Sequence, residues 1–359
     1  MPPTPLGAFA PEVELPRDWS ARLDESGRGR FEPLVTDSAV YVADGDGQVA
    51  RLERDGGQRA WLVELDAALA SGVGGDDGRV LVATGDGAVV ALDAADGAEL
   101  WRARASSEVL APAAAGFGTL AVRSADGRLA SLDPATGRER WSASWTPPAL
   151  TLNGYGMPRV LDGGLLVGLD DGRVVALDAR NGRPIWESAL SVASGRSEVE
   201  RLVDVDADVA VDDRGIYAVN HRGRAVRLEP GRGQAVWSVP MSSTAGLALG
   251  PEAVAVVDEE SVVRALDKAT GRELWAQKAL RGRRLSPPAV AAGLVIVGDL
   301  EGYVHALRLD DGALAGRARP AKARIRARPV ADAGALVVQA VDGTVASLRL
   351  PRDAVAARP

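Results

Sequence analysis

Residues 85–101 read GDGAVVALDAADGAELW, and close copies of this stretch recur along the chain. ADGRLASLDPATGRERW occupies 125–141 and DDGRVVALDARNGRPIW occupies 170–186, while looser copies end at Trp61, Trp237 and Trp275. Two degraded copies follow, at 300–316, where Gly316 replaces tryptophan, and at 341–350. One turn position recurs in all eight copies, at Gly47, Gly87, Gly127, Gly172, Gly223, Ser261, Gly302 and Gly343. The chain is therefore a repeat array, which must be recognised before any fold is assigned.

The chemistry of one copy predicts two turns and two strands. Asp171-Gly172 between alternating apolar runs is a strong β-hairpin signal. The residues that follow, 173–177, alternate as the two faces of a strand do. Asp178 can hydrogen-bond its own backbone and Gly182 can adopt positive φ, which closes a second turn. Trp186 then supplies a large apolar surface for packing between neighbouring units.

With two further strands before each copy, the unit is a four-stranded antiparallel sheet of about 40 residues, which is typical of a propeller blade. Eight copies predict an all-β, eight-bladed β-propeller. The eighth copy lacks its tryptophan strand, and PRDWSARL at 16–23 is such a strand without a hairpin before it. We therefore expect Trp19 to complete the last blade, in a single propeller domain over 15–350 between an N-terminal tail, 1–14, and a C-terminal tail, 351–359. Seven of the eight tryptophans then share one structural position, and Trp145 is left over.

The amino-acid composition excludes or disfavours several classes of function. The net charge of −7 argues against a nucleic-acid partner. The absence of cysteine excludes disulfides and thiolate metal sites. No apolar run is long enough to span a membrane, and residues 1–15 do not read as a signal peptide. We expect either a cytoplasmic protein or one whose signal has been removed.

Two connections between repeats are longer than the others. Most gaps from a tryptophan position to the next turn are 24 to 27 residues, but Trp141 to Gly172 is 31 and Trp186 to Gly223 is 37. The two insertions join consecutive blades, so we expect them side by side on one face, where binding residues concentrate. The first carries Leu150 and Leu152 in WTPPALTLNGYG.

The second insertion contains Asp204, Asp206 and Asp208 at alternate positions. A calcium loop starting at Asp204 needs glycine at its sixth position and glutamate at its twelfth, but these are Val209 and Gly215. The alternation also fits a strand with its acids on one side. From these residues alone, a solvated acidic edge is favoured, and a protein-docking surface with an apolar pair beside an acidic pair is the alternative.

Two weaker signals carry charge. His221 and His305 are expected at equivalent turns of different blades, at no spacing typical of metal ligands. Lys322, Arg324, Arg326 and Arg328 alternate in AKARIRARP. They favour a solvated strand edge that resists edge-to-edge pairing over a groove for an anionic ligand.

The blade phrase resembles the pyrroloquinoline-quinone-type propeller repeat. SGRSEVERLVDVD at 194–206, VIVGDLEGYVHALRLDDG at 295–312 and PVADAGALVVQAVDGTVASL at 329–348 are similar to segments of one family in that group, the outer-membrane assembly lipoproteins BamB. The resemblance implies a non-catalytic subunit of the machinery that assembles outer-membrane β-barrels, without cofactor or metal. Its implied partners are a POTRA domain of BamA, the other subunits of the BAM complex and unfolded outer-membrane proteins.

The resemblance also implies residues and a location. The docking residues would be the apolar pair Leu150 and Leu152 and the acidic pair Asp204 and Asp206, with Arg201 bracing the loop. Asn153 stands where the family has arginine, which suggests a co-adjusted partner. The family works at the periplasmic face of the outer membrane through a lipidated cysteine that this chain lacks, as a truncated soluble form would. The alternatives are a propeller that binds a small ligand or another partner, and a quinone-dependent dehydrogenase.

Overall fold

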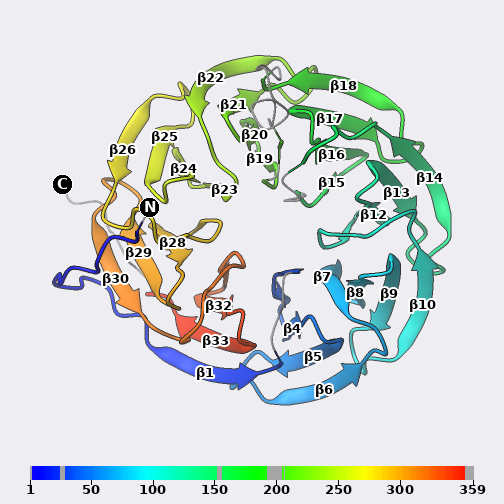
Figure 1. The fold of residues 1–359 in the computed structure, drawn as a ribbon, viewed down its shortest axis with the longest axis horizontal. Helices are drawn as coiled ribbons and strands as arrows, with labels where there is room; N and C mark the ends of the chain where they lie inside the picture. The colour runs from blue at the N-terminus through cyan, green and yellow to red at the C-terminus, as the bar shows by residue number, and fades with distance from the viewer. Residues whose placement is uncertain (1, 25–28, 152–155, 192–203, 206, 352–359) are drawn as a thin grey trace.

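The computed structural model describes residues 2–24, 29–151, 156–191, 204–205 and 207–351. Eight antiparallel blades form a closed ring around a central axis (Figure 1), which confirms the predicted eight-bladed β-propeller. No helix occurs among the described residues. In blades 1 to 7, the strands of each repeat follow one another from the axis to the rim in chain order.

The first four blades contain these strands. Blade 1 has β3 (Leu34–Val35), β4 (Ala39–Ala43), β5 (Gln48–Glu53) and β6 (Arg59–Glu64). Blade 2 has β7 (Leu69–Asp76), β8 (Arg79–Thr84), β9 (Ala88–Asp93) and β10 (Glu99–Arg104). Blade 3 has β11 (Ala114–Gly116), β12 (Thr119–Arg123), β13 (Arg128–Leu132) and β14 (Glu139–Ser144). Blade 4 has β15 (Arg159–Leu161), β16 (Gly164–Gly168), β17 (Arg173–Asp178) and β18 (Pro184–Ala189).

The other four blades complete the ring. Blade 5 has β19 (Ala210–Asp212), β20 (Gly215–Val219), β21 (Gly223–Leu228) and β22 (Ala235–Met241). Blade 6 has β23 (Gly246–Leu249), β24 (Ala253–Val257), β25 (Val263–Asp267) and β26 (Glu273–Gln277). Blade 7 has β27 (Ala289–Ala291), β28 (Leu294–Gly298), β29 (Val304–Arg308) and β30 (Leu314–Ala318). Blade 8 has β31 (Val330–Asp332), β32 (Ala335–Gln339), β33 (Thr344–Arg349) and, from the other end of the chain, β1 (Arg17–Arg22).

The N-terminal strand closes the ring as predicted. β1 pairs antiparallel with β33, with Trp19 opposite Ser347, so the blade is assembled from both ends of the propeller. A bulge lies just before Trp19, and the same irregularity precedes Trp101 and Trp186 in their outer strands. The shared bulge shows that the three tryptophans occupy one structural position.

One strand was not predicted. β2 (Arg30–Phe31) pairs in parallel with β7, with Arg30 opposite Ser71 and Phe31 opposite Gly72, and makes blade 2 five-stranded. The added strand lies at the edge nearest the axis. A two-residue strand has no periodicity, so the sequence carried no signal for it.

At seven of the eight interfaces, a tryptophan reaches across to join one blade to the next. The Trp19 indole N–H donates to the Arg54 carbonyl over 2.8 Å, which joins blade 8 to blade 1. The same contact recurs for Trp61, Trp101, Trp141, Trp186, Trp237 and Trp275, each to a carbonyl of the following blade. Beneath each ring lies the glycine of the next blade's second turn. A Cβ on Gly182 would lie 2.3 Å from the ring of Trp141. These glycines are therefore required both by positive φ and by close packing.

Apolar side chains fill the spaces between the blades. Across the closing interface, Trp19, Val337 and Val345 pack against Val40 and Val42. An equivalent cluster lies between each other pair of neighbouring blades. The clusters thus form a closed ring in which the described sheets bury apolar side chains against both neighbours.

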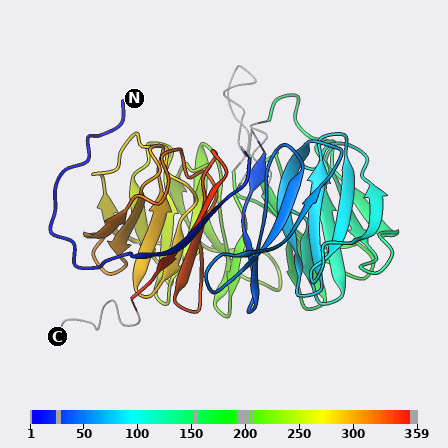
Figure 2. The same ribbon diagram turned by 90° about the horizontal axis from the view of Figure 1, so that it is seen from below.

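Residues 2–14 of the expected N-terminal tail lie along the outside of blades 6 and 7 (Figure 2). The N–H groups of Glu12 and Val13 donate to the Ala315 carbonyl over 2.8 and 3.0 Å. A Cβ on Gly316 would lie 2.7 Å from the Val13 carbonyl oxygen. The glycine that replaces tryptophan in the seventh repeat thus makes room for the N-terminal segment.

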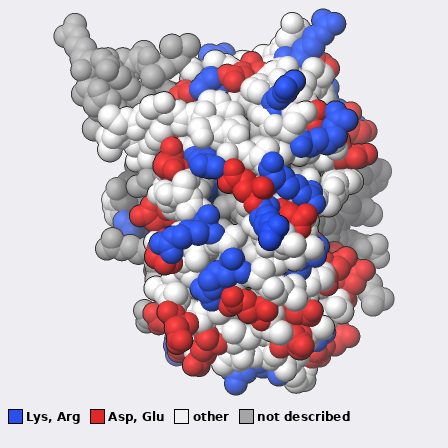
Figure 3. Space-filling model, turned by 90° about the vertical axis from the view of Figure 1, so that its right-hand side faces the viewer, with Lys and Arg blue, Asp and Glu red and all other residues white. Residues whose placement is uncertain are grey.

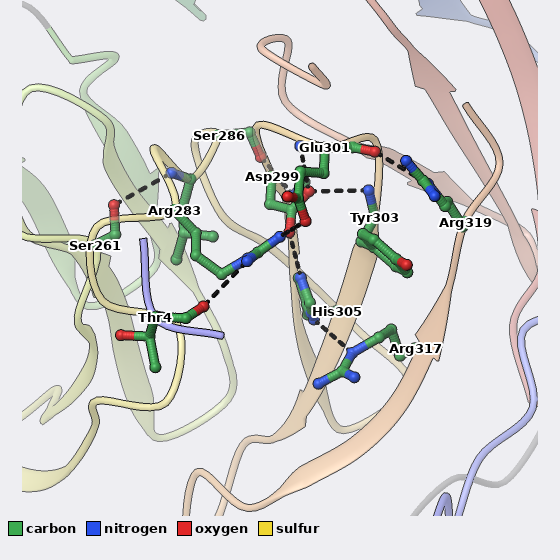
Figure 4. A network of polar contacts seen from close by, with 12 residues as sticks. Thr4, Ser261, Arg283, Ser286, Asp299, Glu301, Tyr303, His305, Arg317 and Arg319 are labelled. Atoms are coloured by element: carbon green, nitrogen blue, oxygen red, sulfur yellow. Dashed lines mark hydrogen bonds and ion pairs between the residues drawn. The ribbon is translucent and has the colours of Figure 1, made fainter. Parts of the chain in front are cut away.

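A buried polar network holds this segment at its other end (Figure 4). Arg283 donates to Asp299 over 2.8 Å and to the Thr4 carbonyl over 3.1 Å. His305 contacts Asp299 through Nε2 over 2.9 Å and accepts from Arg317 at Nδ1 over 3.3 Å. Burial lowers the pKa of His305, which favours the neutral ring with its proton on Nε2. His305 lies within β29, whereas His221 lies in a turn, so the expectation of equivalent turn positions was wrong.

The tryptophan–glycine contact can be tested within blade 4. Gly182 and Gly163 both have φ of +71°, but a Cβ on Gly163 has open space around it. Gly163→Ala should lower the free energy of unfolding by about 1–2 kcal/mol through backbone strain alone. Gly182→Ala should lower it by a further 1–3 kcal/mol or so, because the added methyl displaces Trp141. Urea denaturation of both variants measures the difference, and equal losses would contradict the proposed packing role.

Candidate functional site

The two insertions lie on one face of the ring. A four-stranded antiparallel blade starts and ends on the same face, and its middle turn returns to that face too. We call this the connection face, defined by the links between blades and the turns between second and third strands. The described parts of the links between β14 and β15 and between β18 and β19, residues 145–151, 156–158, 190–191, 204–205 and 207–209, belong to it.

The first insertion is anchored at its ends and exposed in the middle. The Trp145 N–H donates to the Gly127 carbonyl over 3.0 Å, and its ring packs with Met157 against the cluster between blades 3 and 4. The leftover tryptophan thus anchors this loop. Leu150 lies between these anchors and is 41% exposed. Leu152 and Asn153 lie outside the described residues.

The second insertion returns through the space between blades 4 and 5. Val205 and Val209 are buried there, and Asp204 is 0% exposed. The Val205 N–H donates to the Leu169 carbonyl over 3.1 Å, and the Asp204 carbonyl accepts from His221 N–H over 3.0 Å. The expected strand with acids on one side is therefore wrong, since β19 begins only at Ala210. Asp204 is not a surface carboxylate, and Arg201 and Asp206 lie outside the described residues.

Asp208 joins the insertions to the opposite side of the ring. Its carboxylate accepts from the Met157 N–H of the first insertion over 2.7 Å. It also pairs with Arg30 over 2.6 Å and with Arg328 over 3.2 Å. Burial raises the pKa of Asp208, but the two arginines outweigh burial and hold the pKa at about 2. A Cβ on Gly156 would lie 2.7 Å from the Ala207 carbonyl oxygen, so the insertions are side by side as predicted.

The basic stretch lines a cavity at the centre of the ring. The cavity has a volume of about 660 Å³ and is lined by residues of several blade connections, including Arg30, Asp208, Leu285, Arg324, Arg326 and Arg328. Ile325, between two of these arginines, is fully buried. Only Lys322 and Arg326 in this stretch are exposed, so a freely solvated edge was the wrong expectation.

The outer rim carries charge of both signs. Figure 3 shows Lys and Arg side chains intermixed with Asp and Glu over the side formed by β10 and β14. Arg102 pairs with Glu99 over 2.8 Å and Arg128 with Glu139 over 2.7 Å. Such exposed pairs contribute little to stability and create no field of one sign. The rim viewed there is therefore a poorer candidate for a charged partner than the connection face.

The described residues hold neither the ligand cluster of a metal site nor the long apolar helix of a membrane span. There, no group of three or more His, Asp or Glu side chains could hold a metal ion. Asp208, the last of the three alternating aspartates in the second insertion, is already paired with two arginines. Within the same residues, no helix is both long and apolar enough to cross a membrane.

Comparisons with known proteins agree on one family. The family model described as "Outer membrane protein assembly factor BamB" matches residues 45–277 and 258–352. The protein of that name from Pseudomonas aeruginosa is 44% identical over 304 residues, 84% of this chain and 80% of the relative. The crystal structure of BamB from Moraxella catarrhalis has a TM-score of 0.87 and 29% identity, and the match covers 94% of this chain and 100% of that one.

A more distant structure shows how far the fold extends. A quinohemoprotein alcohol dehydrogenase from Pseudomonas putida HK5 has a TM-score of 0.75 over 96% of this chain and 77% of that one. Its identity is 14%, so the likeness concerns the fold alone.

The closed ring of eight blades and its repeat define a β-propeller of the pyrroloquinoline-quinone-like class. Within that class, the chain belongs to the BamB family of outer-membrane protein assembly factors.

The ion pairs of Asp208 predict a pH dependence of stability. The carboxyl has an ordinary pKa of 3.8 and a folded pKa of about 2. Protonation therefore favours the unfolded chain, and the contribution of Asp208, about 2 kcal/mol, is complete above pH 4 and lost toward pH 2. Asp208→Asn should be less stable at pH 7 because two partly buried arginines lose their partner. It should also lose less stability than the wild type between pH 5 and 3. Denaturation across this range measures both slopes, and parallel slopes would contradict the assignment.

Proposed function

We propose that this protein is a non-catalytic scaffold subunit of the outer-membrane β-barrel assembly machinery, which docks through its connection face on a POTRA domain of BamA. Membership of the BamB family supports the role, and the family match spans both insertions. The other subunits of that machinery and unfolded outer-membrane proteins are the further partners we propose. The site of action would be the periplasmic face of the outer membrane, through the lipid anchor typical of the family.

The observation that carries the proposed docking site is the exposure of Leu150. Large apolar side chains at the surface of a rigid scaffold mark interaction sites when they lie on a loop with other candidate contacts. Leu150 is 41% exposed on an insertion that is tied down by Trp145 and by Met157. Because both ends are anchored, little conformational freedom would be lost on binding.

Of the two aspartates expected to form the acidic half of the proposed patch, only one is retained as a contact. Asp204 is buried, so a partner that meets this chain as a rigid body would not contact its carboxylate. We therefore assign the acidic contact to Asp206. Leu152, Asn153 and the bracing Arg201 complete the proposal. Asp204→Arg would replace a buried carboxylate with a larger, oppositely charged side chain and would therefore test folding rather than docking.

Calorimetric titration with the POTRA domains of the cognate BamA tests the docking site. Leu150→Asp should weaken binding at least tenfold, because a charge replaces an apolar contact at the centre of the patch. Ile185→Asp is the matched control, since Ile185 is 57% exposed but lies in the outer strand β18. Asp206→Arg should weaken binding and make it less sensitive to salt.

The outcomes separate the role from the site. If the wild type binds tightly and Leu150→Asp binds equally well, the proposed role stands, but the docking site must lie elsewhere. A wild type that binds no POTRA domain would overturn the proposed function.

A further inference from the structure

The central cavity opens on the connection face. Its lining includes residues 29–32 before blade 1, Leu110 before blade 3, Thr244 and Ala245 before blade 6, and Ala327 before blade 8. Connections from most of the ring thus meet there, which places the cavity on the axis. Its volume of about 660 Å³ lies within the range of small-molecule sites.

One side of this cavity is electrostatically compensated. Arg30 pairs with Glu32 over 2.8 Å and with Asp208 over 2.6 Å, and Arg328 shares the same Asp208. Both guanidinium groups therefore have carboxylate partners.

Arg324, on the other side of the cavity, is not compensated in the same way. Arg324 lies within ion-pair distance of no carboxylate among the described residues, and its guanidinium makes there only a long donation of 3.4 Å to the Arg284 carbonyl. Its Nε is buried without a hydrogen-bond partner in that part of the chain. The charged groups that act on it are Arg326 and Arg284, and burial together with these two cations lowers the pKa of Arg324. A buried donor without a partner among like charges is costly unless an anion joins it.

The backbone holds this cation in place. The Ile325 N–H donates to the Asp299 carbonyl over 3.0 Å, and the Val341 N–H donates to the Arg324 carbonyl over 2.9 Å. Ile325 also forms a β-bridge with Ala340 and is fully buried. Because side chains alternate along extended backbone, Arg324 and Arg326 lie on the opposite side from the buried Ile325, toward the cavity that both line.

We propose that this part of the cavity binds the phosphate group of a small molecule, with Arg324 as the principal contact and Arg326 and Arg284 adding charge. Guanidinium groups match phosphate oxygens in geometry, and a dianion offsets several cations at once. Leu285, Pro287 and Leu110 give the cavity an apolar wall for the rest of such a ligand. The site is separate from Leu150, so it does not rest on the proposed docking.

The test is calorimetric titration of the full chain with inorganic pyrophosphate at constant ionic strength. The wild type should bind one equivalent, and Arg324→Gln should weaken binding at least tenfold, since it removes the main charge-assisted contact. Arg104→Gln changes the net charge equally, but Arg104 is exposed on the rim beside Asp86, so this control should bind as the wild type does.

Thermal denaturation guards against a folding artefact. Without anion, Arg324→Gln should melt no lower than the wild type, because the substitution relieves repulsion from Arg326 and Arg284. Pyrophosphate should raise the melting temperature of the wild type and of Arg104→Gln, but not of Arg324→Gln. No saturable binding by the wild type, or equal affinity in Arg324→Gln, would overturn the proposal. Neither result would bear on POTRA binding.

Discussion

The contact of a tryptophan with the next blade's glycine and carbonyl is the interaction on which the ring depends. A single blade cannot bury both of its faces, so each blade packs against two neighbours. Because the blades are arranged radially, each interface must be closed at the outer rim. There the indole covers a large apolar area while its N–H satisfies a backbone carbonyl, as with Trp141 and Ala179. Only glycine lets the ring approach so closely, and the same residue is needed for the turn that carries the carbonyl. One pair of residues thus fixes both the turn and the spacing of the blades.

The interface between blades 7 and 8 shows what happens when this pair is absent. Gly316 stands at the tryptophan position, and the chain before β1 covers the gap with Val13 and Leu15, which pack into the adjoining cluster. The segment is then held by carbonyl contacts to Arg283 and Arg317, beside the buried Asp299 and His305. The N-terminal segment therefore fills the space that the missing tryptophan of the degraded seventh repeat leaves open. The N-terminal part of the chain both completes blade 8 and covers blade 7.

The eight-bladed ring could be predicted from the sequence because each feature that indicates it lies within a single repeat. Turn glycines, alternating strands and tryptophans recur at fixed spacing, so eight blades and the closing strand with Trp19 could be predicted without knowledge of distant contacts. The site was predicted less completely. The insertions and the exposed Leu150 followed from spacing, but the burial of Asp204 did not, because alternation of Asp and Val reads equally as a surface strand. The partners of Asp208 lie 178 and 120 residues away in sequence, and no local pattern marks them.

The connection face combines rigidity with unequal charge, and both follow from the topology. Every blade link must cross this face, so insertions there extend it without disturbing the strands, and residues from distant repeats converge on the axis. Asp208 uses that convergence to tie two insertions to two other links through Arg30, Arg328 and Met157. A single carboxylate cannot also neutralise Arg324, which is held by its own backbone contacts. The positive charge of Arg324 at the centre is thus a consequence of how the loops are held, and the proposed anion site lies on the same face as the two insertions.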